Sequence, residues 1–457
     1  MNLEPLGTVR KARQHRHGGA SRDITGYDHC LRGRTLLTKN LREYVRTLFS
    51  SILPLFVLAH FTHHVITAIA APLLPLIRSS FALNYAQSGL LLSAFTVSYG
   101  LGHLPAGWLS DRVSAVLMIF IGIAGVAVAG VLFGLAPTFP LLIAAYALIG
   151  LTGSGYHPAA SYLISRVAKP EQRGSALGVH VIGGSASHFL APLLAGGFAV
   201  ALGWRGTFIA LSIPTLVLGI VLVLLLQRAT VKRGISKAEV RAGEEHRRGA
   251  RFWIWLFAFL ILSTLSGAAI GSVIGFIPLL LVDSYGIREE AAAGLQAIIF
   301  SGGFWAAPLA GYLSDRIGKL RLLFGACIMI VPVVFFLPRI PVGVGFYALL
   351  ILIGVFMFVR MPISESFLFA HAPARRRSTL LGVYFLGSSL GGGVFTPVIG
   401  WLIDRNDFRY GFGAMALAIL VLTVACGAIL LALKSEGSQS AEPSASNTSR
   451  ENAQPSV

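Results

Sequence analysis

Charged residues are scarce in this chain, because Asp, Glu, Lys and Arg make up only 12% of its 457 residues while hydrophobic residues make up 55%. Soluble domains carry charge on about 25% of their residues, so a soluble globular protein is not expected. Cysteines are also few. Cys30, Cys327 and Cys426 have no spacing typical of a metal site, and we therefore expect neither a metal centre nor a structural disulfide.

Motifs of enzymes and molecular motors are missing as well. The sequence has no Gly-x4-Gly-Lys-Ser/Thr loop, so ATP hydrolysis through such a loop is excluded as the energy source. A membrane-embedded hydrolase in which His157 and Glu365 activate water is an alternative. It lacks a paired metal motif and an activated nucleophile, and we expect no enzymatic activity and no cofactor.

Long apolar stretches dominate what is present. They have about twenty residues each, the length that crosses a hydrocarbon core of about 30 Å, and they recur from Leu48 almost to Lys434. Each crossing must be a helix or part of a closed barrel, and runs this apolar exclude the alternating strands of a barrel. We predict an all-α membrane protein with twelve transmembrane helices, near 49–77, 86–108, 114–135, 139–165, 174–200, 206–227, 252–282, 290–312, 320–337, 342–371, 377–402 and 410–433.

Basic residues predict the orientation of these helices. The segment 1–47 is a basic tail without the apolar run of a signal sequence. The loops on the same side of the membrane carry most of the remaining Lys and Arg, which places both termini in the cytoplasm and the chain in the cytoplasmic (inner) membrane. Because the net charge of +18 is concentrated in this tail and these loops, no nucleic-acid partner is expected. The polar segment 434–457 is expected to be a disordered tail.

The chain contains an internal repeat. The segment 107–112 recurs at 311–316, and the same offset pairs Pro158 with Pro362 and Arg173 with Arg377. This repeat predicts two pseudo-symmetric six-helix bundles, 48–227 and 252–433, joined by a cytoplasmic linker at 228–251. In such folds the substrate site lies between the bundles, near the middle of the bilayer.

The repeated segments carry a family resemblance. They resemble the Gly-x-Leu-Ser/Ala-Asp-Arg-x-Gly-Lys/Arg loop of the major facilitator superfamily, which implies transport by alternating access. The resemblance implies that this loop acts as an electrostatic gate; tight cytoplasmic turns are the alternative. The second copy is complete, whereas Ser114, Ala115 and Val116 interrupt the first. The implied gating residues are Gly107, Asp111, Arg112, Gly311, Asp315, Arg316, Gly318, Lys319 and Arg321.

Other segments are similar to the fosmidomycin-resistance type of exporter within this superfamily. They are His60 followed by 72–75, the segment 84–89, and the segment 155–160. That group commonly has an Asp four residues after the first His. Here the position holds His64, so the proton-coupling scheme of that group does not carry over directly.

Polar residues inside the first predicted helix follow helical spacing. His60, His63, His64 and Thr67 fall on one stripe, near mid-membrane, where ionisable groups usually face a cavity or a partner. We interpret the histidines as part of a substrate or proton pathway, and hydrogen-bonded neutral imidazoles are the alternative. Interhelical hydrogen bonding is the expected role of the isolated polar residues His103, His180, His188, Asn84 and Gln296.

Charged residues inside the tenth predicted helix are the second candidate group. Arg360 and Glu365 interrupt an apolar run, and Arg360 lies too deep to reach water easily, so we expect it to be paired. Glu365 is a candidate proton carrier or substrate ligand, and Arg360 a fixed positive charge for a substrate anion or for Glu365; a structural ion pair is the alternative. The repeat places His157 opposite this segment, as a third member of the pathway.

These features predict a secondary active transporter that moves a small organic solute by alternating access. Proton-coupled efflux is the first interpretation, with protons as coupling ion, the lipid bilayer as surroundings and a monomer as functional unit. Proton-coupled uptake of a small organic anion is the alternative. A non-transporting membrane receptor or scaffold on the same fold is a third possibility.

Overall fold

The computed structural model describes residues 52–112, 114–167, 173–232, 249–371 and 377–437, which lie in one compact unit beginning at Ile52. All regular elements in these ranges are helical, as predicted. The basic tail 1–47 and most of the linker and of the C-terminal tail fall outside the described residues. The predicted domain boundaries therefore stay predictions.

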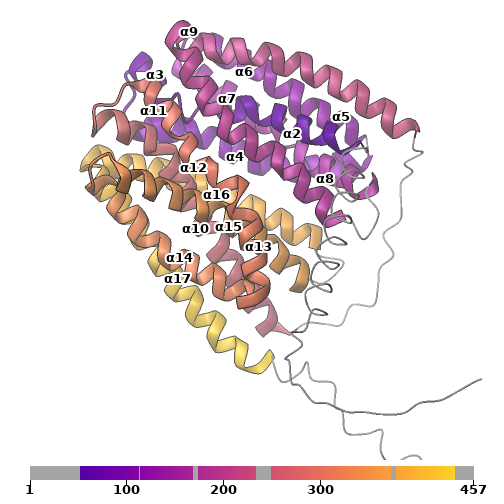
Figure 1. Cartoon of the computed structure of the whole chain (residues 1–457), viewed down its shortest axis with the longest axis vertical. Helices are drawn as coiled ribbons and strands as arrows, with labels where there is room; N and C mark the ends of the chain where they lie inside the picture. Colours follow the sequence, from indigo (N-terminus) through magenta and orange to yellow (C-terminus); the bar gives the residue numbers. More distant parts are fainter. Residues whose placement is uncertain (1–51, 113, 168–172, 233–248, 372–376, 438–457) are drawn as a thin grey trace, which may run out of the picture. The chain divides into compact units, whose positions relative to one another are not determined.

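The first half of the described chain ends with the long helix α9 (Figure 1). Helix α9 contains one non-helical residue, Gly203, with φ 62°. This residue separates the two helices predicted at 174–200 and 206–227. The elements are α2 (Leu53–Thr67), α3 (Leu74–Phe81), α4 (Tyr85–Arg112), α5 (Ala115–Phe120), the π-helix η1 (Ile121–Gly125), α6 (Val126–Leu135), α7 (Phe139–Gly153), α8 (Tyr156–Val167) and α9 (Arg173–Lys232).

The second half begins with the long helix α10 and ends with α17. Its elements are α10 (Ala250–Asp283), α11 (Glu289–Leu295), α12 (Ala297–Ser301), the 3-10 helix η3 (Gly302–Phe304), α13 (Ala306–Ile317), α14 (Lys319–Phe336), the 3-10 helix η4 (Leu337–Arg339), α15 (Val344–His371), α16 (Arg377–Arg405) and α17 (Phe408–Gly437).

Some of the predicted helices are divided. The segment predicted as one helix at 49–77 forms α2 and α3, separated by a turn that contains Pro72. Proline has no amide hydrogen and clashes with the preceding helical turn, which explains the break. The segment predicted at 290–312 is also interrupted, first by a turn at Gln296 and then at Gly302 and Gly303, where the backbone tightens into η3.

The surface of the described helices is typical of a membrane protein. Eight of the described helical segments are long and apolar enough to cross a bilayer, and large apolar side chains such as Val217, Val424 and Met329 are more than half exposed. In water such side chains would lose the stabilisation that comes with burial, at about 25 cal/mol per Å². The arrangement of twelve crossings in two bundles stays a prediction.

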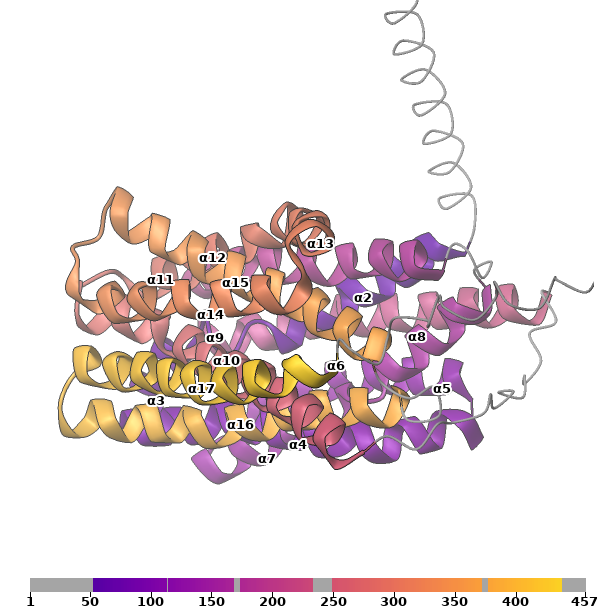
Figure 2. The ribbon, with the colours of Figure 1, turned by 90° about the horizontal axis from the view of Figure 1, so that it is seen from below.

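Helix α4 connects the two halves by packing along α16 (Figure 2). The contact is close because a Cβ placed on Gly400 of α16 would lie 2.3 Å from the carbonyl oxygen of Tyr85. Within the first half α2 packs along α9, and within the second α10 packs along α16 and α17. These contacts bring α2, α8 and α9 together around one group of histidines, and α10, α15 and α16 around Arg360.

Candidate functional site

Six histidines gather in the first half of the protein. Helix α2 contributes His60, His63 and His64, α8 contributes His157, and α9 contributes His180 and His188. The rings of His60 and His64 lie 4.9 Å apart between centroids, and His157 lies 5.0 Å from the first and 5.3 Å from the second. The His60 and His180 rings stack at 4.2 Å. The predicted stripe on the first helix is therefore the centre of a larger cluster, which we call the histidine cluster.

Backbone carbonyls fix the orientation of two of these rings. Nδ1 of His60 lies 2.8 Å from the carbonyl oxygen of His180, and Nδ1 of His63 lies 2.8 Å from that of Gly122 in the π-helix η1. A carbonyl oxygen only accepts hydrogen bonds, so both Nδ1 atoms must donate. In the neutral rings Nε2 is then an acceptor. In both rings Nε2 is buried and has no hydrogen-bond partner in the described part of the chain.

His64 has its own hydrogen-bonded chain. The Thr67 hydroxyl donates to the carbonyl oxygen of His64 at 3.4 Å and lies 3.0 Å from His64 Nδ1. With its hydrogen on the carbonyl, this hydroxyl accepts from Nδ1, which again leaves Nε2 as the lone-pair nitrogen. Thr67 was predicted on the same stripe, and the structure places it in contact with His64 as the helical spacing requires.

A glycine leaves the room that His60 occupies. A Cβ built on Gly184 of α9 would lie 2.6 Å from Cε1 and 2.7 Å from Nε2 of His60. Contacts below about 3.0 Å require a shift, and the stacked, buried ring has little freedom to move. Gly184 is therefore a positioning residue for the histidine cluster.

Among the described residues, no carboxylate lies within ion-pair distance of Arg360. Nη1 of Arg360 on α15 donates to the carbonyl oxygen of Ser263 and to the Tyr384 hydroxyl, both at 2.9 Å. Its Nε is buried and has no hydrogen-bond partner among the described residues. Within the described chain the ion pair shorter than 4.0 Å is Arg78–Asp283, so the direct ion pair of Arg360 with Glu365, which the sequence left open, is not present among the described residues.

Room for the Arg360 guanidinium also comes from a glycine. A Cβ on Gly267 of α10 would lie 2.4 Å from Cζ of Arg360. One turn further along α15, the Ser364 hydroxyl lies 2.5 Å from that of Ser263 and donates to the carbonyl oxygen of Arg360. Neutral hydroxyls and carbonyls thus surround a fixed positive charge, and an anion that reached it would meet no competing carboxylate among these partners.

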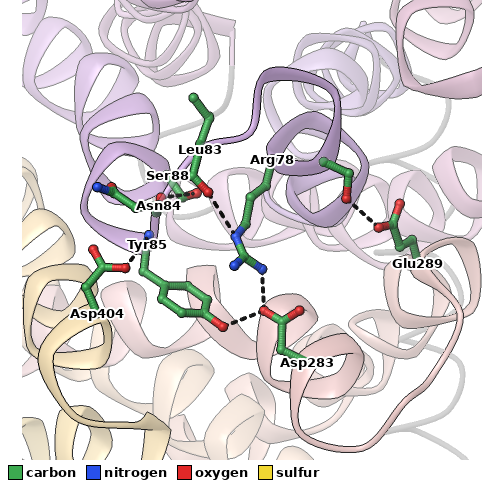
Figure 3. A network of polar contacts seen from close by, with 9 residues as sticks. Arg78, Leu83, Asn84, Tyr85, Ser88, Asp283, Glu289 and Asp404 are labelled. Atoms are coloured by element: carbon green, nitrogen blue, oxygen red, sulfur yellow. Dashed lines mark hydrogen bonds and ion pairs between the residues drawn. The ribbon is translucent and has the colours of Figure 1, made fainter.

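A polar network joins the two halves at one end of the helices (Figure 3). Nη1 of Arg78 in α3 donates to Oδ2 of Asp283 at the end of α10 at 2.5 Å, and the Tyr85 hydroxyl donates to the same oxygen at 2.7 Å. The Ser79 hydroxyl donates to Glu289 of α11 at 2.7 Å. We call these contacts, with the Asp404 contacts described next, the interhalf network.

Asp404 in α16 completes the interhalf network. Its two carboxylate oxygens accept from the backbone amides of Tyr85 and Ala86, each at 2.8 Å. These amides begin α4, where a negative charge is stabilised by the exposed N–H groups and the helix dipole. Burial, together with the hydrogen bond to Asp283, raises the pKa of the Tyr85 phenol far above its ordinary value. The hydroxyl therefore remains protonated and can donate across the interface at any physiological pH.

Part of the predicted gating loop lies outside what can be described. The side chains of Gly107, Asp111, Arg112, Gly311, Asp315 and Arg316 fall outside the described residues, and Arg321 is exposed at the start of α14. Gly318 has φ 92°, a conformation that favours glycine, and it turns the chain from α13 into α14. Lys319 then donates to the carbonyl oxygen of Ser366 in α15 at 3.4 Å.

The structure adds residues that sequence reasoning treated as background. His180 makes the expected interhelical hydrogen bond, with the Tyr156 hydroxyl at 3.1 Å, and it also stacks on His60. His188, whose Nδ1 donates to the carbonyl oxygen of Gly184 within α9, contacts His64 and extends the histidine cluster. The interhalf network was not anticipated; its only sequence signal is a set of charged residues next to the ends of predicted helices. Gln296, by contrast, makes the expected interhelical bond, to the carbonyl oxygen of Ile274 at 3.0 Å.

Comparison with known proteins identifies the class. The family model of the Major Facilitator Superfamily matches residues 56–395 and, in a second match, 260–455. The chain therefore belongs to the Major Facilitator Superfamily, as the loop motif indicated. It is a multi-pass membrane transporter and not an enzyme.

Several relatives show what this chain is similar to. The fosmidomycin resistance protein of Escherichia coli K12 is 24% identical over 372 residues, covering 80% of this chain and 89% of the relative. The D-galactonate transporter of Escherichia coli O6:H1 is 25% identical over 382 residues, covering 77% and 87%. A solved structure of a POT family transporter in complex with 5-aminolevulinic acid shares the fold, with a TM-score of 0.69, 12% identity, and coverage of 83% and 96%.

Proposed function

We propose that this protein is a secondary active transporter that exports a small organic solute in exchange for protons. In this proposal the chain crosses the cytoplasmic membrane twelve times in two six-helix bundles, with both termini in the cytoplasm, and works as a monomer. The observation that carries it is the presence of polar groups inside otherwise apolar helices of each half. The histidine cluster lies in the first half, and Arg360 and Glu365 lie on α15 in the second. Burying such groups in a membrane is costly and usually marks a transport pathway.

Glu365 is the proposed proton carrier. It lies in a long apolar helix that is a candidate membrane span, and it makes no ion pair within 4.0 Å in the described chain. A carboxyl group without a permanent cationic partner can load a proton on one side and release it on the other. In this scheme the solute and the proton alternate at the centre of the protein, with His60, His63, His64 and His157 lining the solute pathway.

The interhalf network is the proposed gate on the non-cytoplasmic side. Opening that side requires α3 and α4 to separate from α10, α11 and α16, which breaks the contacts of Asp283, Glu289 and Asp404. The repeated loop, with Asp315 as its better-preserved acid, is the proposed counterpart on the cytoplasmic side. Alternating access then means that the two sets of contacts exchange.

The environment of Arg360 favours a second candidate, uptake of a small organic anion with protons. A guanidinium held by neutral groups, with Nε unpartnered in the described chain, is suited to bind a carboxylate or a similar anion. A relative of this chain is named as a transporter of D-galactonate, which is a sugar acid. A receptor or scaffold without transport remains the third candidate.

Transport by purified protein in liposomes tests and separates these candidates. Fosmidomycin and D-galactonate serve as probe solutes, each followed with an imposed pH gradient of either sign. Movement of a probe solute in the direction opposite to the protons supports efflux by exchange. Movement of the solute in the same direction as the protons supports uptake. In either case Glu365→Gln should abolish gradient-driven accumulation while solute exchange persists. If the variant accumulates solute as the unmodified protein does, Glu365 is not the proton carrier. The absence of flux for a wide panel of organic solutes would favour the receptor.

A further inference from the structure

Three histidines of the cluster form an arrangement that sequence reasoning did not anticipate. His60, His64 and His157 each place one ring nitrogen so that all three nitrogens lie within 4.8 Å of one another. Cysteine spacing gave no metal motif, and only two of the three are neighbours in sequence. We propose that His60, His64 and His157 form a binding site for a divalent transition-metal ion of the zinc or cobalt type.

The backbone supplies the arrangement that such a site needs. His60 and His64 are one helical turn apart on α2, so their rings project from one face, and His157 approaches from α8. In a tetrahedral zinc site with bonds of 2.0–2.1 Å the ligand nitrogens are separated by about 3.3 Å. In the proposal the separations of up to 4.8 Å close to this value through the His64 and His157 side chains, because the stacked His60 ring has little freedom to move.

The hydrogen bonds that His60 and His64 make through Nδ1 leave the Nε2 atom of each ring available to bind a metal. Nδ1 of His60 donates to the carbonyl oxygen of His180, and Nδ1 of His64 donates to the Thr67 hydroxyl. Metal-bound histidines almost always donate their second N–H in this way, to a carbonyl, carboxylate or water. His60 is only 5% exposed, and its Nε2 has no hydrogen-bond partner within the residues that the structure describes. A buried acceptor without a partner is unfavourable, and a metal ion would satisfy it.

The surroundings of the three histidines define what else would bind. Their ring contacts include His63, His180, His188 and Tyr156, which carry no negative charge in their neutral or protonated forms. A bound ion would therefore keep its full double charge. Three histidine ligands leave a fourth position open, and a carboxylate, phosphonate or hydroxyl oxygen would be favoured there. The metal would thus link the site to an anionic solute.

Cobalt spectroscopy tests the proposal without any transport assay. The purified full-length chain, freed of metal with a chelator, is titrated with Co²⁺, and the visible absorption of tetrahedral cobalt is followed. The N-terminal tail contains His15, His17 and His29, so the same titration is made with these three changed to Gln. We expect one cobalt ion per chain in both proteins, displaced by Zn²⁺. Failure of the cobalt band to develop, or its loss when the tail histidines are changed, would overturn the proposal.

Variants locate the ion. His157→Gln should remove the band, whereas His103→Gln should keep it, because His103 lies outside the triad and its Nδ1 donates to the carbonyl oxygen of Tyr99. Thr67→Val should weaken the affinity by about 10–100-fold, the usual effect of losing an outer-shell partner. To guard against misfolding, His64→Cys offers a ligand of another type, and its thiolate should add a near-ultraviolet cobalt charge-transfer band. If the visible band is unchanged in His157→Gln, and if His64→Cys shows no thiolate charge-transfer band, the metal binds elsewhere.

Discussion

Asp283 is the residue whose change should shift the conformational balance most clearly. Its Oδ2 accepts from both Arg78 and Tyr85, which lie in the other half. Hydrogen bonds to a charged group contribute about 1.5–3 kcal/mol when shielded from water. The two side chains of the ion pair are 27% and 26% exposed, so screening reduces the value. We therefore expect Asp283→Asn to favour the conformation open at this end by about 1–2 kcal/mol, or about 5- to 30-fold in population.

The shift can be measured as a distance between two spin labels at this end of the protein. The labels are placed at Ala201, in the first half, and Ser284, in the second, both exposed, after the natural cysteines are changed to alanine. Pulsed electron resonance should show a larger fraction of long distances for Asp283→Asn. Asp407→Asn is the matched control, because the Asp407 side chain accepts from the amide of Tyr410 within its own half. Equal distance distributions for the two variants would refute the gate.

Two glycine substitutions test how the polar groups are positioned. Gly267→Ala should push the Arg360 guanidinium aside and reduce transport of the probe solutes. In Gly271→Ala, on the same helix, the added Cβ meets nothing within 4 Å, and this variant should transport normally. Equal rates for the two variants in flux assays would show that Gly267 does not position Arg360 for transport. Gly184→Ala should displace the His60 ring and destabilise the protein by about 1–3 kcal/mol, the usual cost of overpacking. Gly197→Ala on α9, which also meets nothing within 4 Å, should be neutral or stabilising by up to about 1 kcal/mol, so a thermal unfolding comparison in detergent decides whether the space beside His60 matters.

Local patterns made part of the site predictable from the sequence. His60, His64 and Thr67 are within two helical turns, so their shared face follows from helix geometry alone. His157 was found through the repeat, which carries information over longer distances. His180 and His188 could not be assigned, because their place in the cluster depends on how α9 packs against α2, and no spacing within α9 shows this.

The interhalf network depends on contacts that are remote in the sequence. Arg78 and Asp283 are separated by more than two hundred residues, and each was visible only as a charge near a helix end. The prediction of one long helix at 49–77 was wrong for a local reason. The apolar sequence continues through Pro72, whereas the helical backbone is broken there. The surroundings of Arg360 were only partly predictable. Its depth inside an apolar helix indicated that the guanidinium needs a partner, but not that a hydroxyl and a carbonyl would be that partner.

Proton movement coupled to solute movement tests the central claim most directly. Liposomes containing the protein and a trapped pH indicator are given a gradient of a transported probe solute, with the membrane potential held at zero by potassium and valinomycin. The account predicts that solute flow drives proton flow in the unmodified protein, and that Glu365→Gln still exchanges solute but moves no protons. Solute flow without any pH change in the unmodified protein, or equal pH changes in both proteins, would contradict it.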